Sequence, residues 1–136
     1  MWTEPKTDWV ISDYFNKEDY NRIKNNIAFL RDLAVTIYNT FSIEDMGSDK
    51  TSYSDFPYAD EFNHLENNLQ TIRDKTFNFY QGSKKTWYEN QRFPNYEDFN
   101  RLEKACLLIY EGLEGQRKNL RRLAFTLGTK QSAIKV

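Results

Sequence analysis

The sequence predicts an all-α protein, an elongated three-helix up-down-up bundle built from three weak repeats, with an extended N-terminal aromatic arm. Three long segments carry apolar residues at alternating steps of three and four, the pattern of helices buried along one stripe. A short polar and aromatic motif opens each of these segments. Since 136 residues suit one domain with its own core, we expect a single helical domain over residues 1–136.

The repeated motif consists of an acidic residue, an aromatic residue, Asn and a basic residue or His. Its copies are Asp19-Tyr20-Asn21-Arg22, Glu61-Phe62-Asn63-His64 and Asp98-Phe99-Asn100-Arg101. Their spacing of about 40 residues is typical of helical arrays and repeat-built bundles. An Asn one turn into a helix can bond an incoming linker, so the motif indicates a module that caps and docks each helix start. The alternative is a polar ring presented to a partner.

The first helix is expected over residues 16–42, after an extended arm at residues 1–15. Asn16 is a suitable N-cap, and Asp19 places a carboxylate in the first turn, where backbone N–H groups lack partners. The expected buried stripe consists of Tyr20, Ile23, Ile27, Leu30, Ala34, Ile37 and Phe41.

The second helix is expected over residues 55–81, with Ser54 or Asp55 as its cap and Pro57 in its first turn. Gly82 is the expected residue after its end. The buried stripe is predicted to be Phe62, Leu65, Leu69, Ile72, Thr76 and Phe79.

The third helix is expected over residues 95–127, capped by Asn95 and ended by Gly128, with an irregular tail at 128–136. Gly112 and Gly115 lie inside its pattern and mark either a bend or a close approach by another backbone or a ring. Its stripe is predicted to be Phe99, Leu102, Cys106, Ile109, Leu113, Gln116, Leu120, Leu123 and Leu127.

Charge is divided unevenly between the two halves of the chain, although the net charge is −1. Residues 1–68 hold six Lys/Arg against thirteen Asp/Glu, and residues 69–136 hold thirteen against seven. Opposite halves can bring copies of the chain together, acidic end to basic end. They can equally neutralise each other inside one bundle.

The sequence offers no constellation for catalysis, a cofactor or a metal. His64 is the one histidine, and Cys106, the one cysteine, falls on a predicted buried stripe. A Cys/His metal site and an internal disulfide are therefore not expected. The sequence also has no Gly-rich phosphate loop and no apolar run long enough to cross a bilayer. We expect a protein that is not an enzyme, uses no cofactor or small-molecule substrate, and is not inserted in a membrane.

The candidate functional residues are aromatic and basic, the types that anchor protein interfaces. The aromatic members could instead fold back over the ends of the bundle, and cations near the end of a helix also suit its dipole. An overall pI near 5.9 argues against nucleic acid as the partner. The predicted partner-binding residues are Trp2, Trp9, Phe15, Trp87, Tyr88, Arg117, Lys118, Arg121 and Arg122.

The N-terminal segment resembles a segment of phage proteins. The matching residues are Thr7-Asp8-Trp9, Asp13-Tyr14-Phe15-Asn16 and the run from Asp19 to Ile27. A Trp in a short extended piece, followed by an Asn-Arg-Ile helix start, is similar to tail and baseplate proteins of phages and prophages of Gram-positive bacteria. Residues 87–103 repeat the pattern in an Asn-Arg-Leu-Glu form, whereas Lys24 departs from the usual Glu.

The resemblance implies a structural subunit of a phage tail, baseplate, neck or phage-derived particle. Such a subunit would be made in the bacterial cytoplasm, reside in the virion and contact other virion proteins or copies of itself. The alternative hypothesis is a small helical adaptor or regulatory protein that binds a protein or nucleic acid in the host.

Overall fold

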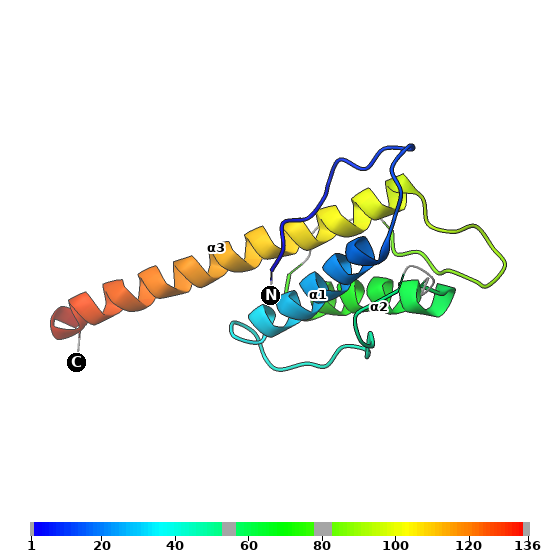
Figure 1. The fold of residues 1–136 in the computed structure, drawn as a ribbon. Coiled ribbons are helices and arrows are strands. Elements are labelled where there is room, and N and C mark those ends of the chain that lie inside the picture. Colours follow the sequence, from blue (N-terminus) through cyan, green and yellow to red (C-terminus); the bar gives the residue numbers. More distant parts are fainter. Residues whose placement is uncertain (1, 53–56, 78–82, 135–136) are drawn as a thin grey trace.

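The computed structural model describes residues 2–52, 57–77 and 83–134, with backbone alone for 121–134. This part of the chain is all-α, without strands, and its helices pack against one another. The helices are α1 (Lys17–Ala34), α2 (Ala59–Lys75) and α3 (Tyr96–Ile134). Extended segments precede α1 and connect the helices (Figure 1).

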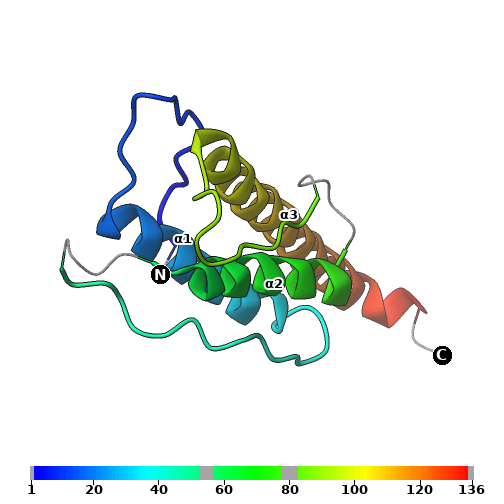
Figure 2. The ribbon, with the colours of Figure 1, turned by 90° about the vertical axis from the view of Figure 1, so that its right-hand side faces the viewer.

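The three helices run side by side in the same direction, so the expected up-down-up order is wrong (Figures 1 and 2). Their starts meet: the rings of Tyr20 and Phe62 are 6.0 Å apart, and those of Phe62 and Phe99 6.4 Å. The segments between the helices return the chain to the same end each time. They can do so because an extended chain advances about 3.3 Å per residue, against 1.5 Å in a helix.

An acidic residue in the first turn helps to fix each helix start. The backbone N–H of Asn16 donates to Asp19 Oδ2 at 3.0 Å, and that of Asn95 donates to Asp98 Oδ2 at 3.0 Å. Both expected caps therefore lie where the sequence placed them. The second helix instead begins at Ala59, after the expected Ser54 or Asp55.

The first helix ends at Ala34, eight residues before the expected boundary at 42. The guanidinium of Arg31 donates to the carbonyl of Phe41 from Nε at 2.9 Å and from Nη2 at 2.7 Å. These bonds hold the chain after α1 in a turn that folds Phe41 back into the core. An apolar residue at a helical spacing can be buried from a loop as well as from a helix.

The other two helices also differ from their expected boundaries. Pro57–Tyr58 and Thr76–Phe77 are not helical, and the rest of the expected 55–81 range outside α2 lies beyond the described residues. Helix α3 passes through Gly128 to Ile134, where an irregular tail was expected. A glycine costs a helix about 1 kcal/mol but does not end it unless a capping turn forms.

The core follows the predicted stripe of each helix. Tyr20, Ile23 and Ile27 of α1 are fully buried, as are Leu65, Leu69 and Ile72 of α2. On α3 the buried stripe runs Phe99, Leu102, Cys106, Ile109 and Leu113 and then stops. Beyond it, α3 extends past the ends of α1 and α2 (Figure 1). We call residues 117–134 the overhang and the remaining described residues the body.

Candidate functional site

The N-terminal arm is held on α3 by a cluster around the buried carboxylate of Glu103. The backbone N–H of Trp9 donates to Asn100 Oδ1 at 2.8 Å, and Asn100 Nδ2 donates back to the Trp9 carbonyl at 2.9 Å. The indole Nε1 of Trp9 donates to Glu103 Oε2 at 2.6 Å. Arg22 of α1 donates to both Glu103 oxygens, at 2.8 and 2.7 Å. These bonds raise the pKa of Arg22 above its ordinary value.

The segment before α3 is held on α2 by the same set of residue types. Trp87 exchanges two backbone bonds with the side chain of Asn63, at 2.7 and 2.8 Å, and its indole Nε1 donates to Glu66 Oε2 at 3.1 Å. Arg101 of α3 donates to both oxygens of Glu66, at 2.8 and 2.5 Å. Each complete cluster thus joins an extended segment and two helices around one carboxylate with at most 1% exposure.

The corresponding place on α1 keeps the Asn and changes the charged residue. Asn21 exchanges two bonds with the backbone of Lys50, at 2.7 and 2.9 Å. Lys24 stands where α2 and α3 have Glu, and its ammonium contacts Asp49 at 2.6 Å and the Gly47 carbonyl at 3.2 Å. No indole occupies this place, because Lys50 stands where the other two segments have Trp.

A second pair of buried asparagines holds two of the extended segments further along. Asn26 exchanges two bonds with the backbone of Thr3, at 2.9 and 2.8 Å. Asn68 does the same with the backbone of Glu44, at 2.7 and 2.9 Å. The asparagines of the motif likewise bind this chain's own extended segments, and its arginines bind carboxylates of neighbouring helices. This is the docking interpretation rather than a ring open to a partner.

Four of the predicted partner-binding aromatic residues pack against the body. Trp9 and Trp87 are 4% and 6% exposed. Trp2 stacks on Tyr110 with ring centroids 4.1 Å apart, and Phe15 stacks on Phe99 at 4.0 Å. In this structure these four side chains fold back over the bundle, which is the alternative that the sequence left open.

The other predicted residues lie on two separate surfaces. Tyr88 is 65% exposed near the start of α2. Lys118 is exposed at the base of the overhang, and Arg117 donates to Glu114 Oε2 at 3.0 Å. Arg121 and Arg122 also lie in the overhang, but their side chains are outside the described residues.

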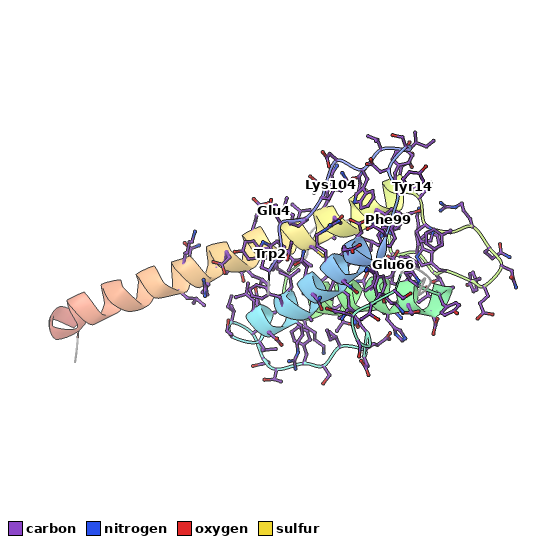
Figure 3. All side chains as sticks on the ribbon, in the orientation of Figure 1. Trp2, Glu4, Tyr14, Glu66, Phe99 and Lys104 are labelled. Carbon is purple, nitrogen blue, oxygen red and sulfur yellow. The ribbon has the colours of Figure 1, made fainter. Side chains whose placement is uncertain are left out.

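Exposed apolar side chains collect at the end of the body where the helices begin. We call this the helix-start face and define it by Ile11, Tyr14, Tyr58, Tyr88 and Phe93, which are 85%, 88%, 67%, 65% and 49% exposed. Two adjoining hollows open there and share Phe93 and Pro94. Tyr14 lies at the opposite end of the molecule from the overhang (Figure 3).

Carboxylates surround the apolar residues of the helix-start face. Exposed acidic residues occupy the first turn of every helix, Glu18, Asp60 and Glu97, and two more line the hollows, Asp13 and Glu89. Nearby cations bind two of these carboxylates, since Lys6 contacts Asp13 at 3.6 Å and Lys17 contacts Glu18 at 3.5 Å. Arg92, which lines the same hollow as Glu89, is paired with the buried Asp98 at 3.1 Å. The face is therefore apolar at its centre and acidic at its margin.

Cys106 is buried in the body, and the ring of His64 is bonded to a carboxylate. Burial raises the pKa of the Cys106 thiol, which keeps it protonated. The ring of His64 contacts Glu44 Oε1 at 2.7 Å, and this bond holds the pKa of Glu44 below its ordinary value. Among the described residues, no group of three or more His, Cys, Asp or Glu side chains could hold a metal ion.

Comparison with family models, curated proteins and solved structures gave no match for this chain. None of the described helices is both long and apolar enough to cross a bilayer.

Two features of the site were not predicted from the sequence. The role of Glu66 and Glu103 could have been found, because each lies three residues after the Asn of its motif. The helix-start face had a weaker signal. Its members are scattered through the linkers, and only the parallel arrangement of the helices brings them together.

Proposed function

We propose that this protein is a non-enzymatic structural subunit that works through protein–protein contacts. The overhang is the observation that carries the proposal. In the body, α3 buries its stripe against α1 and α2, but the same heptad spacing continues through Leu120, Leu123 and Leu127 beyond the ends of those helices.

A partner would stabilise a helix of this kind. The overhang has 18 residues, about 27 Å of helix. The overhang continues a helix that is already nucleated in the body, but it lacks the packing that supplies most helical stability in proteins. A helix that projects with apolar residues at heptad spacing supports assembly with another protein surface.

The particle we propose is a phage tail, baseplate, neck or phage-derived assembly. The support is the resemblance of the segment from Thr7 to Ile27 to tail and baseplate proteins. The contacts of this segment add a physical reason for the pattern, since Trp9 and Arg22 meet on the same carboxylate of Glu103. We further propose that the three helix-start modules are repeats, with the α1 copy altered at Lys24 and Lys50.

Mass spectrometry of purified particles tests this proposal. Phage or prophage particles from the source strain would be purified on a density gradient and their proteins quantified. We expect the chain to co-purify with the particles in a fixed ratio to the other tail proteins. If it remains in the particle-free fraction, or if the source carries no tail or capsid genes, the virion assignment is wrong.

One observation favours the adaptor alternative. Residues 116–136 contain six Lys/Arg and no Asp/Glu, which suits a phosphate backbone as well as an acidic protein. A gel-shift titration with double-stranded DNA at about 0.1 M salt distinguishes a nucleic-acid partner from an acidic protein partner. We expect no shift; a shift that is abolished by Arg117→Glu with Arg121→Glu would favour nucleic-acid binding.

A further inference from the structure

We infer that the overhang of one copy docks on the helix-start face of the next copy, so that subunits join head to tail. This inference rests on the proposed structural role and names the partner and the two surfaces involved. The two surfaces have complementary chemistry, and they lie at opposite ends of the molecule.

The overhang offers leucines and positive charge. After Leu113, the last buried position of the α3 stripe, the heptad continues with Gln116 and Leu120. Gln116 accepts a hydrogen bond from the Tyr38 hydroxyl at 2.6 Å, whereas Leu120 is 49% exposed. The overhang carries five cations, Arg117, Lys118, Arg121, Arg122 and Lys130, and no carboxylate.

The helix-start face offers the complement of both properties. Ile11, Tyr14 and Phe93 line or flank a hollow between the N-terminal arm and the start of α3. Aromatic side chains in such a position commonly anchor interfaces, because they bury a large area at low entropic cost. The carboxylates at the margin would meet the cations of an incoming overhang, which favours this orientation of docking over others.

Side-by-side pairing of two α3 helices fits the structure less well. The stripe of α3 faces α1 and α2 within the body, as its buried residues show. A parallel second copy packed on the continuation of that stripe would run into the place that α1 and α2 occupy. An antiparallel copy would avoid this overlap but would bring two overhangs together, each with only positive charge, so repulsion opposes it.

A head-to-tail contact is heterologous. It generates a ring if the rotation from copy to copy returns to the first subunit, and an open filament if it does not. Except at the ends of an open assembly, every copy uses one overhang and one helix-start face. A copy with only one intact surface therefore stops growth, which gives the inference a sharp experimental signature.

The test uses full-length variants measured by sedimentation velocity over a range of concentrations. The head variant carries Ile11→Lys and Tyr14→Lys, both at exposed positions, and the tail variant carries Leu120→Glu. Leu108→Glu is the matched control, because Leu108 is 44% exposed on the body part of α3 and belongs to neither surface. Circular dichroism would verify that each variant keeps its helices.

We expect the wild type and Leu108→Glu to associate, and this association to weaken with added salt. The head and tail variants should each associate at least about tenfold more weakly, as expected for anchor residues. A mixture of the two variants should form a 1:1 dimer and nothing larger, since it contains one intact overhang and one intact face.

Three results would overturn the inference. A tail variant that associates as well as the wild type would show that the overhang is not used. A head variant that associates normally would show that the helix-start face is not the docking site. A wild type that stays monomeric at about 100 μM would exclude self-docking. Particle composition tests the structural role separately, so that role can survive a monomeric result.

Discussion

The two halves of α3 have the same heptad pattern and different surroundings. From Phe99 to Leu113 the stripe is buried against α1 and α2, and the polar residues beside it bind the arm and the neighbouring helices. From residue 117 to 134 the pattern continues where no described element of the chain covers it. One periodicity thus forms contacts within the chain in the first half, and under our proposal it forms contacts with another protein in the second.

The difference between the halves predicts how each responds to substitution. Changes in the body should lower the free energy of unfolding, because its side chains are bound to one another. Changes in the overhang should leave unfolding nearly unaffected and alter association instead.

The largest expected effect is the loss of the carboxylate at the centre of the arm cluster. Glu103→Ala should cost about 3–5 kcal/mol of unfolding free energy, because Arg22 and the Trp9 indole would lose their common partner in a buried site. Urea unfolding followed by circular dichroism measures it. Glu111→Ala is the control at an exposed site on the same helix and should change stability by less than about 0.5 kcal/mol. Similar losses for both variants would contradict a central role for Glu103.

The next largest effect on the free energy of unfolding is expected for a buried apolar residue of α3, compared with an exposed one in the overhang. Ile109→Ala should cost about 2–5 kcal/mol, because Ile109 is fully buried. Leu120→Ala should cost less than about 0.5 kcal/mol in the monomer, because Leu120 is half exposed. Chemical denaturation at low protein concentration separates the two. Equal destabilisation would mean that the overhang packs on the body.

Alanine substitutions at two glycines of α3 should change the free energy of unfolding in opposite directions. A methyl group at Gly112 would overlap the ring of Phe77, whereas one at Gly115 would meet nothing within 4 Å. Gly115→Ala should therefore stabilise by about 1 kcal/mol from helix propensity. Gly112→Ala should destabilise by about 1–3 kcal/mol, as overpacking does. In a Phe77→Ala background, Gly112→Ala should become stabilising; a loss that persists there would exclude the ring as its cause.

The smallest effect is a pH dependence confined to the body. Burial opposes the charge of Asp98, but Lys85 at 2.6 Å, the Asn95 N–H and Arg92 together hold its pKa below the ordinary 3.8. A depressed carboxyl pKa contributes stability that is present above the unfolded value and is lost as pH falls. Stability should thus decline below about pH 4, and Asp98→Asn should flatten that decline. An unchanged acid limb would contradict this role, with Glu97→Gln as the exposed control.

Much of the body could be predicted from the sequence. The apolar spacing located three helices and most of the core, and Asn16 and Asn95 located two helix starts correctly. One of the two interpretations of Gly112, close approach by a ring, is confirmed, because the ring of Phe77 lies against this glycine. These features depend on residues near one another in the chain, where spacing carries the information.

The direction of the helices and the ends of α1 and α3 could not be predicted in the same way. Helix direction depends on how the long linkers pack, and the hydrogen bonds of Asn63 with Trp87 and of Asn21 with Lys50 that guide them join residues far apart in sequence. The end of α1 depends on Arg31 capturing the Phe41 carbonyl, a bond that no periodicity reveals. The helix-start face appears only after these long-range contacts form.

Hydrogen exchange of the α3 amides tests the distinction between body and overhang most directly. In dilute protein, amides at 96–113 should be strongly protected, while those at 117–134 should exchange close to the rate of an isolated short helix. At concentrations where copies associate, protection should appear in 117–134 and change little in 96–113. Strong protection of both halves in the dilute monomer would contradict the claim that the overhang depends on a partner.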